Sequence, residues 1–417
     1  MKLIGSFSPP GDKSISHRAG LFALLAKGQM RVSNYSPCQD CSSTLAAVAL
    51  LGIEPRFTGD GLVLTGSQGR LRPGALVDCG NSGTTMRLLM GLLSGVPGHF
   101  VLDGDESLRR RPMERVATPL RLMGAAVECP QGRPPVSLKG GGLRGIDYDL
   151  PVASAQLKSA LLLAGVQAEG STFVGEPVKS RDHSERLLAL CGANIRQEPG
   201  GWRVERSDLT LPEQLRVPGD ASSAAFFLCA AAIIPGSEVT SQGTLLNPTR
   251  TGFLKVLARM GADLEIEEQG RVPEEWGRVR ARYSAGLKAC VVRPEEIPLL
   301  VDEVPVLALV ATQAQGSTVL KEVGELRVKE SDRLAAVASQ LGAMGADIRI
   351  VGEDLVINGP TPLKAPAGQL DSFGDHRIAM TLTLAGVLSG GALDIKDEDC
   401  AAVSYPGFRH DLGLMLK

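Results

Sequence analysis

The five residues Pro10-Gly11-Asp12-Lys13-Ser14 return near the middle of the chain as Pro218-Gly219-Asp220-Ala221-Ser222. The second copy begins 208 positions after the first, which is half of the 417-residue length. Both copies precede an apolar, helix-like run that stops at a Lys-Gly or Pro-Gly pair. Chance is the alternative explanation, because Pro, Gly, Asp and Ser are common in turns before helices. The agreement with half the chain length favours a duplication.

A shorter repeat lies within each half. An Ala- and Leu-rich run, a glycine and a short strand-like run follow one another six times, with 66 to 80 residues between the glycines. These glycines are Gly28, Gly98, Gly170, Gly236, Gly316 and Gly391. A second set stands where a helix would end and a strand begin, and consists of Gly52, Gly124, Gly192, Gly261 and Gly345. Units of about 70 residues are larger than solenoid repeats, so we expect two globular α/β domains of three units each.

The N-terminal segment is expected to join the second domain. The first copy of the repeat starts near residue 13, which leaves residues 1–12 outside it. We therefore predict one domain from residues 13–218 and another from residues 1–12 with 219–417. The chain would cross between them twice, and we expect the active site in the cleft between the domains.

The charge balance excludes several classes of function. The chain carries 44 Lys and Arg against 46 Asp and Glu, a net charge of −2, and 43% of its residues are hydrophobic. A soluble globular protein fits this composition, whereas a general nucleic-acid or membrane-surface binder would need a basic excess. There is no apolar signal segment at the start, and the run from Ala224 to Ile234 is too short to span a bilayer. A cytoplasmic location is therefore expected.

The cysteines do not indicate a metal site. Cys38 and Cys41 have the C-x-x-C spacing, but no second pair or C-x-x-x-H accompanies them, and a structural zinc needs about four ligands. Eight cysteines in a chain of this length are also too sparse for a disulfide framework. We interpret the pair as two ordinary reduced thiols and expect no metal.

Cationic and small residues gather at the starts of the expected helices. Lys13, Ser14 and Arg18 can converge with exposed backbone N–H groups, an arrangement that binds phosphate. The glycine-rich turn 80–87 can do the same, although a plain capping turn is the alternative. The run 109–111 is three arginines, which either lie in solvent or balance an anion.

Two carboxylates interrupt the apolar stretch 298–312, and buried carboxylates are costly unless paired or used. Asp302 or Glu303 could simply cap a helix. The functional alternative is an acid/base group whose proton affinity is set by burial and a nearby lysine. Glu330, between Lys329 and Arg333, is a second candidate for this role.

Taken together, these segments resemble the 5-enolpyruvylshikimate-3-phosphate synthase family, in its class II branch. Matching segments occur in family order along the whole chain: PGDKSISHR (10–18), GNSGTTMR (80–87), RPM (111–113), SAQLKSALLLAG (154–165), RDHSE (181–185), PGDASSAA (218–225), NPTR (247–250), VDEVPVLAL (301–309), KESDRL (329–334) and DHRIAM (375–380). The resemblance implies the inside-out α/β barrel of two domains, each with three βαβαββ units.

The resemblance also implies the reaction and its residues. The family moves the carboxyvinyl group of phosphoenolpyruvate onto the 5-hydroxyl of shikimate 3-phosphate, releases phosphate and uses no cofactor; we expect a monomer. Shikimate 3-phosphate would be held by Lys13, Ser14, Arg18, Ser154, Ala155, Gln156, Arg181, Asp302 and Lys329. Phosphoenolpyruvate would be held by Lys13, Gly83, Arg111, Gln156, Arg333 and Arg377. Asp302 and Glu330 would move protons, with Lys13 and His376 as electrostatic or relay partners.

Four positions depart from the family pattern. Val403 stands where many members have a lysine, so one cation of the phosphoenolpyruvate site is missing or replaced. Ala155 replaces a serine, which leaves a backbone contact only. Ser82 and Leu88 replace an alanine and a proline beside the pocket of the inhibitor glyphosate, so sensitivity to it is open.

Two rival functions fit parts of this pattern. UDP-N-acetylglucosamine enolpyruvyl transferases share the fold, but they open with Lys-Asn where this chain has Lys13-Ser14, and they carry a reactive cysteine before the Arg-Pro. No cysteine lies between residues 80 and 128 here. A non-catalytic anion-binding protein of the same fold would be expected to have lost Asp302 or Glu330, and both are present.

Overall fold

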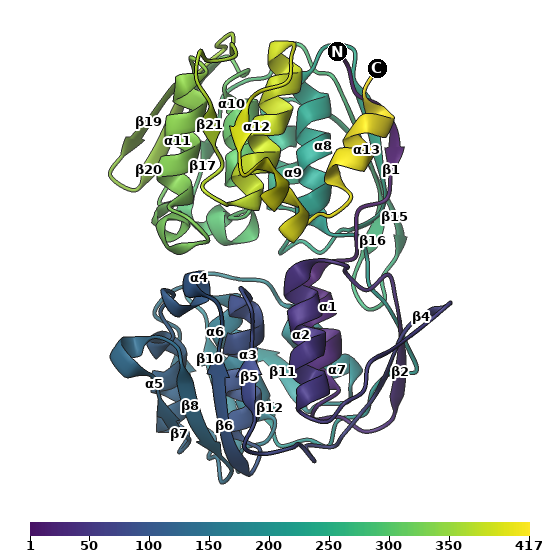
Figure 1. Ribbon diagram of the computed structural model, residues 1–417, viewed down its shortest axis with the longest axis vertical. Helices are drawn as coiled ribbons and strands as arrows, with labels where there is room; N and C mark the ends of the chain where they lie inside the picture. Colours follow the sequence, from purple (N-terminus) through teal and green to yellow (C-terminus); the bar gives the residue numbers. More distant parts are fainter. The chain divides into compact units, whose positions relative to one another are not determined.

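The computed structural model describes all 417 residues and divides them into two compact units (Figure 1). We call Gly11–Val217 the first unit and Met1–Pro10 with Pro218–Lys417 the second unit. The N-terminal segment belongs to the second unit because β1 (Ile4–Phe7) pairs in parallel with β14 (Glu238–Leu245).

The first unit is built from three four-stranded sheets and the helices between them. Its elements are α1 (Lys13–Phe22), β2 (Gln29–Ser33), α2 (Gln39–Leu50), β3 (Arg56–Thr58), β4 (Gly61–Thr65), β5 (Leu76–Asp78), α3 (Gly83–Ser94), β6 (Gly98–Asp103), α4 (Glu106–Arg109), α5 (Glu114–Leu122), β7 (Ala126–Glu128), η1 (Pro130–Gly132), β8 (Val136–Gly140), β9 (Asp147–Asp149), α6 (Ala155–Gly165), β10 (Ser171–Gly175), α7 (His183–Leu190), β11 (Ile195–Glu198), β12 (Gly201–Glu205) and β13 (Gln214–Arg216). The sheet orders are β13-β2-β4-β3, β5-β6-β8-β7 and β9-β10-β12-β11. Each begins with a parallel pair and continues with two antiparallel partners, so one pattern occurs three times.

The second unit repeats this pattern less completely. Beyond β1 and β14 its elements are α8 (Ala221–Ile233), α9 (Gly252–Met260), β15 (Asp263–Gly270), β16 (Trp276–Arg282), β17 (Val291–Val292), η2 (Pro294–Leu299), α10 (Val304–Ala311), β18 (Gly316–Leu320), η3 (Gly324–Val328), α11 (Arg333–Ala343), β19 (Asp347–Val351), β20 (Asp354–Gly359), β21 (Leu370–Asp371), α12 (His376–Ser389), β22 (Ile395–Lys396), η4 (Glu398–Val403) and α13 (Phe408–Met415). Two of its sheets have the orders β1-β14-β16-β15 and β17-β18-β20-β19. The third contains only the parallel pair β21 and β22, after which the chain continues into η4 and α13.

The innermost helices have no polar stripe. Nearly every residue of α3 and α6 is buried, and the two helices pack together so closely that a Cβ on Gly91 would lie 2.1 Å from the Ala160 carbonyl oxygen. In the second unit α8, α10 and α12 pack on one another, and every residue of α8 is buried. Helices that are apolar all round must be covered all round. The sheets supply that cover, which makes each unit an α/β barrel with its helices inside.

The repeat glycines mark left-handed backbone. Gly261 ends α9 with a φ of 91°, a conformation that costs a residue with a Cβ more than it costs glycine. At the end of α12 the left-handed residue is Gly390, with a φ of 92°, rather than the marker Gly391. None of the helices is long and apolar enough to cross a membrane.

Candidate functional site

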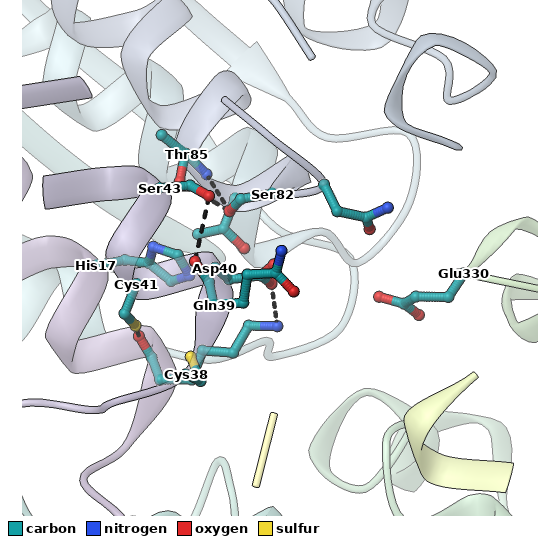
Figure 2. A network of polar contacts seen from close by, with 12 residues as sticks. His17, Cys38, Gln39, Asp40, Cys41, Ser43, Ser82, Thr85 and Glu330 are labelled. Atoms are coloured by element: carbon teal, nitrogen blue, oxygen red, sulfur yellow. Dashed lines mark hydrogen bonds and ion pairs between the residues drawn. The ribbon is translucent and has the colours of Figure 1, made fainter. Parts of the chain in front are cut away.

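The start of α1 carries the first cation of the site. Asp12 caps the helix by accepting a hydrogen bond from the Ile15 amide at 2.8 Å. Lys13 follows as the first helical residue, and its ammonium forms an ion pair with Asp40 in the first turn of α2 (Figure 2). The Lys13 side chain remains 22% exposed. An ammonium in this position is held in place and still open to an anion.

A buried chain of hydrogen bonds joins the three helices α1, α2 and α3. His17 Nδ1 lies 2.6 Å from the Thr44 hydroxyl, which lies 2.6 Å from the Thr85 hydroxyl, which donates to Ser82 Oγ at 2.8 Å. Figure 2 labels His17, Ser82 and Thr85, which stand at the two ends of this chain of hydrogen bonds. Burial lowers the pKa of His17 to about 3, against the opposing effect of Asp40. The imidazole is therefore neutral and serves to connect α1, α2 and α3.

The glycine-rich turn 80–87 both caps a helix and leaves space beside two guanidinium groups. Ser82 accepts from the Thr85 amide at 3.1 Å, so the capping interpretation is confirmed for Ser82. A Cβ added at Gly83 would lie 3.3 Å from Nη1 of both Arg87 and Arg111. Two positive groups thus converge at the N-terminus of α3, where the backbone N–H groups add to the attraction for an anion.

Gln156 lies at the same place, near the start of α6. Its Oε1 accepts from Arg87 Nη1 at 2.5 Å, and its Nε2 donates to Thr84 Oγ1 at 2.9 Å. Ser154 is the N-cap of α6 and accepts from the Leu157 amide at 3.4 Å. The first unit therefore brings Gln156 next to the turn that holds Gly83.

Only one of the three consecutive arginines belongs to this cluster. Arg109 pairs with Asp103 at 2.6 Å and Arg110 with Glu106 at 2.5 Å, both at the exposed surface. Arg111 instead donates from Nη2 to Asn81 Oδ1 at 2.6 Å. The solvated-run interpretation is thus correct for the first two residues and wrong for the third.

Arg18 is buried, with 3% of its surface exposed. Its guanidinium donates to the Ser184 and Ser159 hydroxyls at 2.7 and 2.8 Å and to the Ser14 carbonyl oxygen at 2.8 Å. It therefore fastens α1 to α6 and α7. Arg181 is half-buried in the loop that leads from β10 to α7.

In the second unit, three carboxylates surround one buried arginine. Arg333 is 1% exposed, and it contacts Asp302 at 3.3 Å, Glu330 at 2.5 Å and Asp375 at 2.9 Å. Burial alone would lower the pKa of Arg333, but the three negative neighbours outweigh it and raise the pKa. Asp302 also pairs with Arg377 at 3.4 Å. The two carboxylates expected to move protons therefore share one guanidinium.

Asp375 holds this arrangement together. It is fully buried, caps α12 by accepting from the Arg377 amide at 2.9 Å, and accepts from the Ser331 hydroxyl at 3.1 Å. Burial raises the pKa of Asp375, and the charge of Arg333 overrides that effect so that the pKa lies below its usual value. The carboxylate is an ionised anchor for Arg333.

Lys329 and His376 complete the cluster. Burial lowers the pKa of Lys329, and the charge of Asp302 opposes the shift. Its ammonium lies 3.6 Å from Glu325 and the side chain is 24% exposed. His376 is the first residue of α12 and is 3% exposed.

Helix capping does not explain the carboxylates before α10. Glu303 occupies the N-cap position but accepts no capping hydrogen bond through its side chain, and it is 1% exposed. Asp302 directs its side chain to the two arginines instead. The capping interpretation of this pair is therefore wrong for Glu303.

Three residues of these clusters were not assigned a role from the sequence. They are Asp40, Arg87 and Asp375, and each fixes the side chain of an assigned residue. Arg87 is the last residue of the segment 80–87, and Asp375 is the first residue of the segment 375–380. Their presence in these motifs could have marked them as site residues. Asp40 stands 27 positions from Lys13, and nothing in the local pattern joins them.

A first comparison concerns the fold. The chain is structurally similar to the enolpyruvyl transferase NikO from Streptomyces tendae, with a TM-score of 0.80 over 99% of this chain and 95% of that one. The two sequences are 19% identical, so this likeness concerns the fold alone. The two chains therefore share their architecture.

Closer comparisons identify the family. The family model of EPSP synthase (3-phosphoshikimate 1-carboxyvinyltransferase) matches residues 1–412. A 3-phosphoshikimate 1-carboxyvinyltransferase from Bacillus licheniformis is 46% identical over 97% of this chain and 96% of its own, and one from Gloeobacter violaceus is 49% identical over 99% and 96%. An EPSP synthase structure from Acinetobacter baumannii has a TM-score of 0.88 at 40% identity, covering 99% and 96%. The chain belongs to the EPSP synthase family.

These findings confirm the sequence-based expectations of fold, family and class of enzyme. The chain is a transferase of the shikimate pathway. The domain boundaries with their intervening active site, and the individual site residues, remain predictions.

Proposed function

We propose that this chain transfers the carboxyvinyl group of phosphoenolpyruvate to the 5-hydroxyl of shikimate 3-phosphate and releases phosphate without a cofactor. The family membership supports the reaction, and the Arg333 cluster carries the argument for its chemistry. Two carboxylates held on one buried guanidinium offer two positions for proton transfer.

Shikimate 3-phosphate would be held mainly through its anionic groups. Lys13 and Ser14 at the start of α1, with Ser154 and Gln156 at the start of α6, supply hydrogen-bond donors and positive helix ends. The other residues assigned to this substrate are Arg18, Ala155, Arg181, Asp302 and Lys329. Arg18 would act by holding the Ser14 backbone.

Phosphoenolpyruvate would lie against the guanidinium groups. Gly83 leaves space next to Arg111, and planar guanidinium groups bind carboxylate and phosphate oxygens in pairs. Lys13, Gln156, Arg333 and Arg377 would contribute the remaining contacts.

The reaction needs two proton transfers. One group takes the proton of the 5-hydroxyl as the oxygen attacks C2, and another delivers a proton to C3. The adduct then collapses by the reverse movements and expels phosphate. Asp302 and Glu330 would divide these steps, while Lys13 and His376 stabilise the charges that develop. Exclusion of water from the loaded site would strengthen every charged contact.

A two-substrate assay tests the proposal. Phosphate release should require phosphoenolpyruvate and shikimate 3-phosphate together, and neither alone should suffice. Turnover with UDP-N-acetylglucosamine in place of shikimate 3-phosphate would assign the chain to the rival reaction. No phosphate release with either acceptor would favour the non-catalytic alternative. A cytoplasmic monomer stays the expectation for its state in the cell.

A further inference from the structure

The proposed reaction gives no role to the C-x-x-C pair at the start of α2. Cys38 is the N-cap residue of this helix and Cys41 lies in its first turn, so the spacing brings both thiols to one side of the helix start. Figure 2 shows the two sulfur atoms next to each other. All eight cysteines are free thiols, so this pair is available for a disulfide.

The two thiols differ in acidity. A hydrogen bond between the Cys38 and Cys41 side chains is the largest influence on the pKa of Cys38 and, with the nearby charge of Lys13, lowers it to about 7 against the effect of burial. Burial raises the pKa of Cys41 well above its ordinary value. Cys38 is therefore the nucleophilic thiol, and Cys41 remains protonated. A pair of thiols that oxidises in two steps needs one thiol of each kind. Elsewhere burial raises the pKa of Cys191 to about 12.

The pair is directly connected to Lys13. The Cys41 thiol donates to the Lys13 carbonyl oxygen at 3.6 Å. Asp40, which forms the ion pair with the Lys13 ammonium, stands between the two cysteines in the sequence. A disulfide would draw the sulfur atoms to about 2.05 Å and remove the thiol hydrogen that reaches Lys13. We expect the first turn of α2, which carries Asp40, to adjust to this bond.

We propose that Cys38 and Cys41 are a redox modification site, which hydrogen peroxide oxidises to a reversible intramolecular disulfide that weakens the Lys13 site. The Cys38 thiolate attacks the O–O bond, becomes a sulfenic acid and releases hydroxide. The Cys41 sulfur then attacks Cys38, its thiol proton is lost and a second hydroxide leaves. The two sulfurs lose two electrons, peroxide gains them, and with the two thiol protons two waters form. The effect on Lys13 rests on the proposed function; the disulfide itself does not.

Burial restricts the oxidant. Both cysteines are fully buried, so a small uncharged peroxide should reach them faster than a bulky disulfide such as oxidised glutathione. This difference gives the proposal a kinetic signature. Equal rates with the two oxidants would contradict the buried-pair argument.

Mass spectrometry tests the modification without an activity assay. The full chain is treated with hydrogen peroxide, unfolded with an alkylating reagent and digested. The peptide that contains Cys38 and Cys41 should be about 2 Da lighter than the reduced peptide and unalkylated, and dithiothreitol should restore it. Cys79 and Cys229 in the same sample should stay reduced under peroxide and should therefore carry the alkyl group. Sulfonic acid on either cysteine, or no change, would overturn the proposal.

Activity measurements test the link to Lys13. Peroxide should lower kcat/KM of the wild type by about tenfold, equivalent to about 1.4 kcal/mol, and dithiothreitol should restore it. Cys38→Ser should keep its activity under peroxide, whereas the control Cys191→Ser should respond as the wild type does. A disulfide without loss of activity would overturn the link. A reduced enzyme inactive with both substrates would instead refute the proposed function.

Discussion

Replacing Gly83 by alanine should selectively weaken the binding of phosphoenolpyruvate. The added Cβ would lie 3.3 Å from Nη1 of both Arg87 and Arg111, closer than nearly all natural Cβ contacts, so the guanidinium groups would have to move by a few tenths of an ångström. Gly83 has no positive φ and begins α3, so alanine suits the backbone. The perturbation is therefore local to the charged groups.

The size of the effect follows from the contact at risk. A hydrogen bond to a charged group contributes about 1.5–3 kcal/mol, and each 1.4 kcal/mol is tenfold. KM for phosphoenolpyruvate should rise about 10- to 100-fold while KM for shikimate 3-phosphate stays unchanged.

Steady-state phosphate release, with each substrate varied in turn, measures both constants. Gly59→Ala is the matched control, because no atom lies within 4 Å of its added Cβ. If both KM values rise together, or neither changes, the placement of phosphoenolpyruvate beside Gly83 is refuted.

Three further changes probe other parts of the structure. Arg111→Ala should weaken phosphoenolpyruvate binding far more than shikimate 3-phosphate binding, and equal losses by calorimetry would contradict the assignment. Lys158 is fully buried between Glu176 and Glu185 at 2.8 and 2.6 Å, so Lys158→Met should cost about 3–5 kcal/mol in urea unfolding, while an unaltered midpoint would show the ion pairs to be unimportant. The pKa of His17 is about 3 in the folded protein, against an ordinary value of 6.5 that we expect in the unfolded chain. The unfolded chain therefore binds more protons, so the free energy of unfolding falls as the pH drops below about 6.5. Between pH 6.5 and 5 the wild type should lose about 2 kcal/mol of unfolding free energy through His17. Urea unfolding at the two pH values measures this loss, which a His17→Asn variant should not show.

The repeats made the architecture predictable from the sequence. A glycine with a left-handed backbone conformation is hard to replace by another residue. The glycines that end helices therefore recur at similar intervals along the sequence, and these intervals indicate the repeated units. Gly261 and Gly345 are such positions, with φ values of 91° and 95°. The small size of the last sheet was not predictable. The residues after Gly391 form only the two-residue strand β22 before η4 begins.

The site was predictable only as far as local patterns reach. Three adjacent arginines look alike in sequence, and only their partners separate Arg111 from Arg109 and Arg110. Those partners are brought close by folding. The ion pair between Lys13 and Asp40 was not predictable for the same reason, because folding brings together two residues on different helices.

In the proposed reaction the carboxylates on Arg333 carry out the proton transfers, and single-turnover phosphate release by Asp302→Asn measures their contribution. The variant should lose at least ~100-fold in rate, the usual scale for an acid/base group, and still bind shikimate 3-phosphate in calorimetry. Asp332→Asn is the control, because Asp332 only caps α11 and pairs with Arg327 in a half-exposed position. A rate for Asp302→Asn equal to that of this control would contradict the account.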